Sequence, residues 1–213
     1  MPTNLKLLAI FAHPDDESMG MGGTLAKYAA EGVETYYVCA SRGERGWFGP
    51  DVVAETPNPK ITLDGTKMDI YFSPDDGVLS ALAPVLNSAQ ESIYFLAYSF
   101  TSNDLGAIVR QKHAAGLTVE GVMDEEQVSS NQGTEYDPFL QDSVPVRLDG
   151  NPGLMHHKVF IIDDKIVAFG SYNFSQSAEE RNDENLIIVY NPVIAHQFIL
   201  EFERVQGEAQ RND

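Results

Sequence analysis

The 213-residue sequence has only one cysteine, Cys39, and few basic side chains. A single cysteine excludes an internal disulfide and favours a reducing compartment, so we expect a cytoplasmic protein. Fourteen Lys and Arg stand against 32 Asp and Glu, which gives a net charge of −18. An acidic excess of this size repels polyanions at long range and disfavours loose, sequence-independent binding to nucleic acid. There is also no polybasic segment suited to an anionic membrane surface.

Long apolar runs are missing as well. Residues 1–13 have no basic segment before their apolar run, so we expect neither a signal peptide nor a transmembrane span. The sequence contains no internal repeat and no low-complexity segment. The composition is that of a globular protein with a core, because 43% of the residues are hydrophobic and 22% are charged.

The N-terminal part predicts a small Rossmann-like βαβ unit. Residues 5–12 and 33–41 are apolar enough for two buried strands. Residues 22–32 between them predict a helix that ends at Gly32. From residue 42 to residue 66 glycine and proline replace hydrophobic periodicity, which indicates a loop or linker. The sequence therefore predicts a module over residues 1–50, a linker over 51–66 and a second domain over 67–213.

The second domain predicts an α/β fold, a mixed β-sheet with helices on both faces, because strands alternate with helices and then cluster. Ser102 or Asn103 is the expected N-cap of one helix, and Gly116 its C-terminal glycine. Residues 125–136 read as a polar loop, and the Tyr and Phe residues of 92–100 read as core. The expected strands are 67–73, 92–100, 117–124, 144–150, 156–163, 165–173 and 184–190, and the expected helices are 77–90, 102–116 and 192–208.

Residues 155–185 are the most informative stretch of the sequence. Side chains alternate between the two faces of a strand, so His156 and Lys158 are expected to share a face. Asp163 has the opposite parity and is expected to point away from them.

The same stretch continues with a hydroxyl, an amide and a carboxylate. Ser171 and Asn173 are expected to share a face of the next strand, and Glu184 opens the strand after it. A histidine, an ammonium group, a hydroxyl and an amide at one place form a cradle for an anionic tetrahedral group. The histidine can attack such a group while the other side chains hold its oxygens.

These residues resemble the HKD motif of the phospholipase D superfamily. The similarity extends over residues 66–210, nearly all of the second domain. It implies a phosphodiesterase that cleaves phospholipid or nucleic acid, and it leaves open whether transfer to an alcohol competes with hydrolysis. The resemblance is carried by His156, Lys158, Asp163, Gly170, Ser171, Asn173 and Glu184.

The resemblance implies that His156 is the nucleophile. It would attack phosphorus, expel an alcohol and leave a covalent phosphohistidine. Lys158, Ser171 and Asn173 would hold the non-bridging oxygens as negative charge builds on them.

Two further residues receive supporting roles from the resemblance. Glu184 would orient a histidine ring, as the third member of a catalytic triad does. Asp163 would be structural and would hold the turn after its strand. The family requires no metal and no other cofactor.

The family chemistry needs two histidines, one that attacks and one that protonates the leaving group. This sequence contains a single HKD motif and no second H-x-K. It resembles the short members of the family, whose active site forms across a two-fold axis. We therefore expect a homodimer in which each chain contributes its His156.

The other histidines of the second domain have ordinary interpretations. His157 has odd parity and is expected to face the core or the next layer. His113 lies near a helix C-terminus, where an imidazole suits the helix dipole. His196 is expected to be a surface or packing residue of the last helix.

The first residues carry a second resemblance. The sequence "AHPDDE", followed by "GMGGTLAKYAAEG", is similar to LmbE-like, or PIG-L, zinc deacetylases of N-acetylglucosamine-type sugars. That resemblance implies that His13 and Asp16 bind zinc and that Asp15 is a general base. A catalytic zinc site needs a third ligand, and the similarity stops near residue 50. A zinc-dependent deacetylase and an inactive fusion module remain the alternatives to a phosphodiesterase.

Overall fold

The computed structural model describes residues 6–11, 28–39 and 60–209. The chain divides into two compact units, residues 1–55 and 56–213. In the first unit, β1 (Lys6–Phe11) and β2 (Glu34–Cys39) pair in parallel along their whole length. Residues 28–30, just before β2, are helical. Parallel neighbours need a crossover connection, so this arrangement agrees with the expected βαβ unit.

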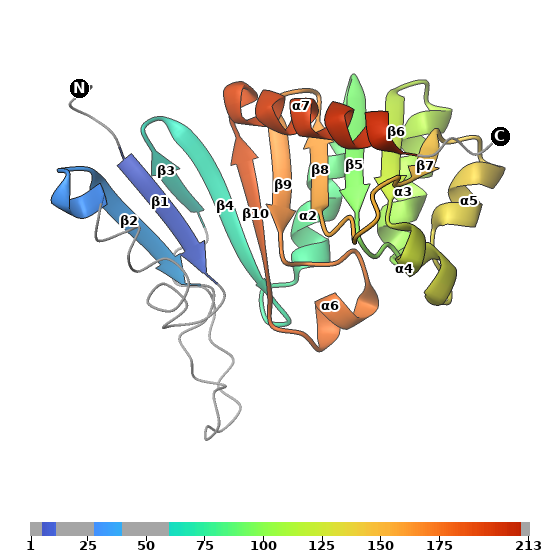
Figure 1. Ribbon diagram of the computed structural model, residues 1–213, viewed down its shortest axis with the longest axis horizontal. Coiled ribbons are helices and arrows are strands. Elements are labelled where there is room, and N and C mark those ends of the chain that lie inside the picture. The colour runs from blue at the N-terminus through green and yellow to red at the C-terminus, as the bar shows by residue number, and fades with distance from the viewer. Residues whose placement is uncertain (1–5, 12–27, 40–59, 210–213) are drawn as a thin grey trace. The chain divides into compact units, whose positions relative to one another are not determined.

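The second unit is built on one mixed sheet of eight strands in the order β3-β4-β10-β9-β8-β5-β6-β7 (Figure 1). The neighbours β5, β6 and β7 are parallel, and the other pairs are antiparallel. The strands are β3 (Lys60–Leu63), β4 (Thr66–Ser73), β5 (Ser92–Ala97), β6 (Thr118–Met123), β7 (Val146–Leu148), β8 (Lys158–Ile162), β9 (Ile166–Gly170) and β10 (Glu184–Tyr190).

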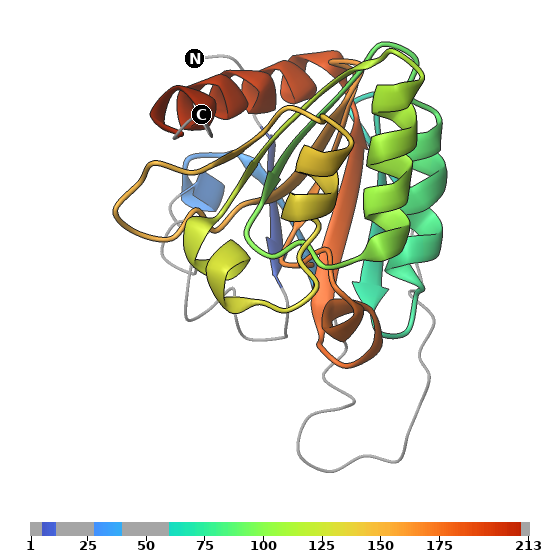
Figure 2. The ribbon, with the colours of Figure 1, turned by 90° about the vertical axis from the view of Figure 1, so that its right-hand side faces the viewer.

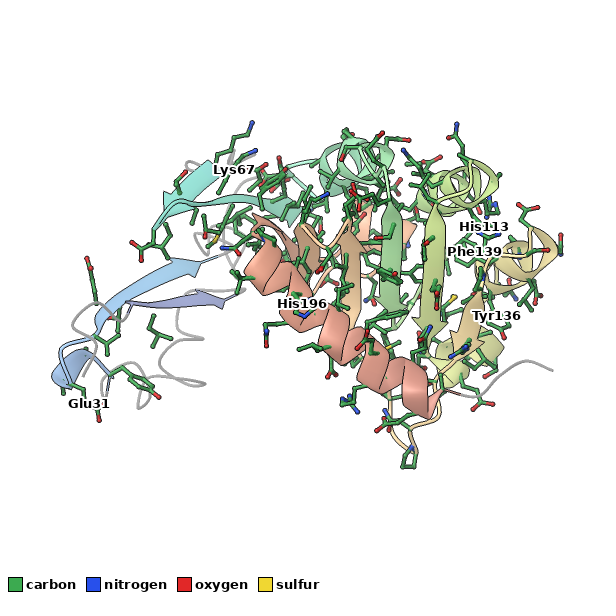
Figure 3. The ribbon with its side chains drawn as sticks, turned by 90° about the horizontal axis from the view of Figure 1, so that it is seen from above. Glu31, Lys67, His113, Tyr136, Phe139 and His196 are labelled. Atoms are coloured by element: carbon green, nitrogen blue, oxygen red, sulfur yellow. The ribbon has the colours of Figure 1, made fainter. Side chains whose placement is uncertain are left out.

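Helices cover both faces of this sheet, which confirms the expected α/β class. Figures 2 and 3 show the longest helix, α7, on one face, and α2 and α3 side by side on the other. The helices are α2 (Val78–Asn87), α3 (Asn103–Ala114), α4 (Glu125–Ser130), α5 (Tyr136–Gln141), α6 (Gln176–Glu180) and α7 (Pro192–Glu208).

The main core lies between the sheet and the layer of helices that contains α2 and α3. Its centre is a cluster of five buried phenylalanines with neighbouring ring centroids 4.4–5.9 Å apart. Rings at these separations add edge-to-face contacts to the free energy of burial. The cluster packs one ring from β5 and one from β8 against a ring of α5 and two rings from segments outside the named strands. Its members are Phe95, Phe100, Phe139, Phe160 and Phe174.

One strand lies inside the segment that was assigned to the linker over residues 51–66. Residues 60–63 form β3, which pairs with β4. The two strands are joined by Asp64 and Gly65, whose φ angles are 49° and 81°. An Asp-Gly pair with positive φ at both positions is the preferred two-residue hairpin connection. The linker interpretation is therefore wrong for residues 60–63.

The segment of residues 125–136, expected to be a loop, contains α4 and the first residue of α5. The carboxylate of Asp124 caps α4 by accepting a hydrogen bond from the Gln127 backbone N–H at 2.9 Å. Helices of six residues hold too few turns for a hydrophobic period to appear in the sequence. The N-cap of α3 is Ser102, one of the two residues expected there.

Candidate active site

The residues of the HKD pattern and those that follow it gather mostly at one edge of the sheet. β8 runs antiparallel to β5 and β9, so it begins where those two strands end. β10 is antiparallel to β9 and begins at the same edge. In Figure 1 this is the edge of the sheet next to α4 and α6. The polar residues at this edge are His156, Lys158, Ser171, Asn173 and Glu184.

Lys158 is the first residue of β8 and is 5% exposed. Its ammonium group donates a hydrogen bond to the backbone carbonyl of His156 at 2.9 Å. The same nitrogen lies 4.6 Å from the centroid of the Tyr98 ring. Its charge is thus met by a carbonyl and an aromatic face, and no carboxylate in the described part of the chain forms an ion pair with it.

The environment of Lys158 changes its proton affinity. Burial disfavours the ammonium form and lowers the pKa of Lys158 to about 8, although the carboxylates of Glu184 and Asp124 act in the opposite direction. The side chain is therefore still largely charged at neutral pH, and it loses its proton far more readily than a surface lysine does.

His156 exposes its imidazole at the same edge. Its ring centroid lies 4.4 Å from that of Tyr98, at an interplanar angle of 60°. Burial and the charge of Lys158 lower the pKa of His156, while Asp124 and Glu184 favour protonation. A lowered pKa keeps the imidazole neutral near pH 7, which is the form with a free nitrogen lone pair for nucleophilic attack.

Ser171 lies just beyond the end of β9, not within the strand as the sequence indicated. Its hydroxyl oxygen accepts a hydrogen bond from the Asn185 backbone N–H at 3.0 Å, and its own N–H donates to the Asn185 side chain at 3.2 Å. The hydroxyl hydrogen remains available for donation to a ligand. A Cβ at the preceding Gly170 would collide with the Asn185 carbonyl, so glycine is required where the two strands approach.

Asn173 also lies past the end of β9. Its side-chain oxygen is buried and has no hydrogen-bond partner among the described residues. A buried amide without a partner is costly in a folded protein and is more common where function requires it. The chain around Asn173 is held against α2 through Glu179 of α6. The Glu179 carboxylate accepts hydrogen bonds from the Tyr172 hydroxyl at 2.8 Å and from the N–H of Leu79, in α2, at 3.0 Å.

Glu184 is the first residue of β10, opposite Ser73 of β4. Its carboxylate accepts a hydrogen bond from the Asn182 side chain at 3.2 Å. It is close enough to His156 and Lys158 to favour their charged forms. Within residues 60–209, however, no hydrogen bond joins Glu184 to a histidine ring, so its expected orienting role stays a prediction.

Asp163 lies at the opposite end of β8, away from the other motif residues. Its carboxylate accepts hydrogen bonds from three successive backbone N–H groups, at 2.9 Å from Ser92, 2.8 Å from Glu91 and 3.0 Å from Gln90. Burial alone would raise the pKa of Asp163, but these donors and the charge of Lys165 lower it overall. The contacts hold the turn that leads into β5, rather than only the turn after β8.

Sequence reasoning missed two residues at the site edge. Tyr98 was interpreted as core, but it is only half-buried and its ring lies against His156. Asp124 follows β6 and is 1% exposed. Besides capping α4, it accepts a hydrogen bond from the Met155 N–H at 2.8 Å and so ties the end of β6 to the segment before His156. Because Asp124 directly follows a strand that ends at this edge, the sequence could have predicted that it lies near the site.

The remaining histidines of the second unit lie elsewhere. The ring of His157 faces α7, where its Nε2 is 3.3 Å from a Glu201 carboxylate oxygen. His196 lies on the exposed side of α7, 3.3 Å from Asp164, and His113 is in the last turn of α3 (Figure 3). These positions agree with the structural interpretations of all three residues.

His13, Asp15 and Asp16 fall outside the described residues, so the structure does not place the zinc ligands that the second resemblance implies. In the parts that the structure describes, no three His, Cys, Asp or Glu side chains are grouped so as to hold a metal ion. Nor does any helix there combine the length and the apolar character needed to cross a membrane.

The sequence was compared with models of known protein families. Residues 82–206 match the family described as "Cardiolipin synthase, PLD-like domain". The chain belongs to the phospholipase D-like family. This membership confirms the predicted family, its α/β fold and the expected enzyme class. A second match, to "GlcNAc-PI de-N-acetylase", covers residues 8–55 and confirms the resemblance of the N-terminal part.

Individual relatives of this phospholipase D-like chain point the same way. It is 30% identical to a phospholipase D of Rickettsia bellii over 69% of this chain and 76% of the relative. It is also 30% identical to a mitochondrial cardiolipin hydrolase of Chlamydomonas reinhardtii, over 60% of this chain and 56% of that protein. The crystal structure of Nuc, a phospholipase D family member from Salmonella typhimurium, matches with a TM-score of 0.64 and 27% identity, over 68% of this chain and 97% of Nuc.

Proposed function

We propose that the chain is a phosphodiesterase that works through a covalent phosphohistidine at His156. The observation that carries the proposal is the pairing of an exposed imidazole, kept neutral, with the buried ammonium group of Lys158 at one edge of the sheet. The imidazole supplies a nucleophile, and the ammonium group supplies positive charge where negative charge develops.

The proposed reaction has two displacement steps at phosphorus. In the first, an imidazole nitrogen of His156 forms a bond to phosphorus and the bond to the leaving alcohol oxygen breaks. A second, protonated histidine donates its proton to that oxygen. In the second step water attacks phosphorus, the same second histidine takes its proton, and the P–N bond breaks to release a phosphomonoester. Lys158, Ser171 and Asn173 hold the non-bridging oxygens throughout, and no metal takes part.

The second histidine is proposed to be His156 of an identical chain. The sequence has one HKD motif. Among the other described histidines, His113 lies on α3, His157 contacts Glu201 of α7, and His196 of α7 contacts Asp164. A two-fold axis is the simple way to bring the same residue of two chains together. The proposed unit of activity is therefore a homodimer with one shared site, and Glu184 is proposed to orient one of its imidazole rings.

A phospholipid is the proposed substrate class, with nucleic acid as the second candidate. Two of the relatives named above are a phospholipase D and a cardiolipin hydrolase. The charge of −18 opposes binding of a polyanion. Exposed acidic side chains also begin α4, at Glu125 and Glu126, next to the site edge.

For the N-terminal module, proposed to span residues 1–50, deacetylase activity has little support. The deacetylase family match ends at residue 55, which leaves the third zinc ligand without a matched position. The single cysteine supports placing the protein in a reducing compartment such as the cytoplasm.

The test compares the wild type with His156→Ala on three substrates: bis-p-nitrophenyl phosphate, phosphatidylcholine or cardiolipin vesicles, and plasmid DNA. We expect the wild type to cleave the small diester and a phospholipid in the presence of EDTA, and His156→Ala to cleave neither. His196→Ala, a histidine variant on exposed α7, serves as the control and should keep wild-type rates. Wild-type activity that survives in His156→Ala contradicts the proposal, and so does a wild type inactive on all three.

A further inference from the structure

The imidazole of His156 is held in an unusual way. Its ring makes no hydrogen bond to the residues that the structure describes, although a nucleophile must present one nitrogen in a fixed direction. Its ring contact is with Tyr98, at a centroid separation of 4.4 Å and an interplanar angle of 60°. The centroid of the Tyr98 ring also lies 4.6 Å from the ammonium nitrogen of Lys158. One ring therefore contacts both of the residues proposed to do the chemistry.

Tyr98 is itself fixed at both ends. Its backbone N–H donates to the His157 carbonyl at 2.7 Å, which continues the pairing of β5 with β8 beyond the strand ends. Its hydroxyl oxygen accepts a hydrogen bond from the Gln127 side chain at 3.0 Å. Gln127 in turn accepts from the Asn131 side chain at 3.0 Å, and Asn131 also donates to the Ser99 hydroxyl at 3.1 Å.

This chain of contacts lies among half-buried residues, outside the fully buried core. A half-buried tyrosine can satisfy its hydroxyl with water, and the core below it is already filled by phenylalanines. Helix α4, which contains Gln127 and ends just before Asn131, is fixed to the segment before His156 by the cap residue Asp124. The network thus joins the ring to the segment that carries the nucleophile.

The aromatic face also contributes to the electrostatics of His156. Burial is the largest influence that lowers the pKa of His156, and Lys158 and His157 act in the same direction, whereas Asp124 and Glu184 favour the imidazolium form. The negative face of an aromatic ring favours a cation within about 6 Å of its centroid. Tyr98 is therefore expected to favour the imidazolium form of His156, as the two carboxylates do. It makes no hydrogen bond to the ring that could block either imidazole nitrogen.

We propose that Tyr98 is a positioning residue of the active site: its ring holds the His156 imidazole and the Lys158 ammonium group in their working orientation, and Gln127 and Asn131 fix that ring through its hydroxyl. The inference rests on the proposed function, because it assigns Tyr98 a task in presenting the nucleophile. The ring accounts for most of the effect on activity, and the hydrogen bond from Gln127 to its hydroxyl accounts for a smaller part.

The test separates the ring from the hydroxyl. Tyr98→Phe keeps the ring, Tyr98→Leu removes it, and Gln127→Leu frees the hydroxyl from its donor. Tyr94→Leu is the matched control, because Tyr94 lies on β5, which ends just before Tyr98, but packs on Phe202 of α7, with ring centroids 5.0 Å apart. Two quantities are measured: kcat/KM on bis-p-nitrophenyl phosphate across pH, and the pKa of the His156 ring by NMR, assigned with His156→Ala.

We expect Tyr98→Leu to lower kcat/KM by about 10- to 100-fold, because misplacement of a reacting group is costly. The NMR pKa of His156 should fall by about 0.5 in that variant, the size of an exposed cation–π contact. Tyr98→Phe and Gln127→Leu should lose about threefold in kcat/KM and keep the wild-type pKa, since each loses one hydrogen bond outside the reacting groups. Tyr94→Leu should change thermal stability and neither of the two measured quantities.

The inference is overturned if Tyr98→Leu keeps both wild-type values, or if Tyr98→Phe loses as much activity as Tyr98→Leu. Wild-type kcat/KM in both Tyr98→Phe and Gln127→Leu overturns the role assigned to the hydrogen bond between Gln127 and the Tyr98 hydroxyl. Should Tyr98→Leu not fold, a wild-type His156 pKa in Tyr98→Met would serve as the contradicting result. Full activity in His156→Ala refutes the proposed function itself, whereas an inactive His156→Ala beside an unchanged Tyr98→Leu refutes the positioning role alone.

Discussion

The two ends of β8 carry the same motif but differ in what their polar residues contact. At its first end, His156 exposes a ring and Lys158 buries an ammonium group that no carboxylate of the described chain pairs with. At its last end, Asp163 accepts three backbone hydrogen bonds and has a lowered pKa. The charge at the first end has a carbonyl and an aromatic ring as neighbours but no ion-pair partner in the described chain, whereas the charge at the last end accepts three hydrogen bonds.

The difference explains the spacing of the motif. The four residues between Lys158 and Asp163 are the rest of the strand, and they cross the sheet within the buried core. The H-x-K-x4-D pattern thus combines two tasks: its first two residues are proposed to serve chemistry at one edge, and the third holds the turn at the other. Unsatisfied polar groups are typical of functional sites, whereas satisfied ones stabilise the fold.

The largest expected effect on activity comes from a substitution at the first end of β8, where His156 lies. His156→Ala should lower kcat by about 10⁴-fold or more, because without its nucleophile the site cannot form the covalent intermediate. The free energy of unfolding should stay within about 0.5 kcal/mol of the wild type, since the side chain is exposed. Steady-state kinetics and urea unfolding measure the two effects. A His156→Ala protein that unfolds much more easily would argue that this end is also structural.

Lys158→Met sharpens the same contrast. We expect kcat to fall by about 10²- to 10³-fold, as for loss of a group that stabilises transition-state charge. Stability should be retained or increased, because the variant removes a buried charge that lacks an ion-pair partner. Lys165→Met, an exposed lysine in the hairpin turn at the other end of β8, is the control and should keep wild-type kcat. Equal loss in both variants would contradict a special role for Lys158.

The pH dependence of activity and of stability should have opposite signs. With a pKa of about 8, Lys158 loses its proton as the pH rises through 8, and activity should then fall about tenfold per pH unit. Between pH 8 and the ordinary lysine value of 10.5 the unfolded chain binds the proton more tightly than the folded chain. Stability should therefore rise with pH across this window, relative to Lys158→Met. A parallel fall of both quantities would contradict the assignment.

The smallest effect on activity is expected at the satisfied end. Asp163→Asn should cost about 1–3 kcal/mol of stability, because a charged acceptor of three N–H groups is replaced by a neutral one. Its kcat should stay within about twofold of the wild type, since Asp163 lies a full strand away from His156. The lowered pKa of Asp163 means that this stabilisation is present at neutral pH and is lost as the pH falls through the folded-state value.

Asp164→Asn is the control for the Asp163 variant. Both aspartates have positive φ, 54° and 49°, which asparagine tolerates equally well. Asp164 is exposed and forms an ion pair with the exposed His196 at 3.3 Å, so its variant should stay within about 0.5 kcal/mol of the wild type. Equal destabilisation by the two variants, seen in thermal or urea unfolding, would show that the turn and not the hydrogen bonds of Asp163 matters.

The regular parts of the molecule could be predicted from the sequence. Parity along the predicted strand placed Asp163 away from Lys158; in the structure the two are apart because Asp163 lies beyond the last residue of β8, in the turn at its opposite end. Parity also directed His157 to the opposite layer, where the structure finds Glu201 of α7. The motif residues were found because their spacing follows the pleat of one strand and the length of the next.

The parts that sequence reasoning missed depend on tertiary contacts. Tyr98 sits in an apolar run and looks like core, since nothing local shows that the chain ends its strand at Ala97 and turns the ring toward His156. Asp124 acts through a segment 31 residues away, and Ser171 falls just past the end of its strand. The strand β3 was missed because four residues give too short an alternation, although Asp64 and Gly65 could have indicated the hairpin.

The central claim is that one His156 from each of two chains forms a single site. Wild-type and His156→Ala chains carrying different tags are co-expressed over a range of ratios, and activity is plotted against the fraction of wild-type chains. If the site is shared, a mixed dimer is inactive, so activity should follow the square of that fraction and reach about one quarter at equal amounts. A straight line through one half would mean that each chain acts alone, and it would contradict the account.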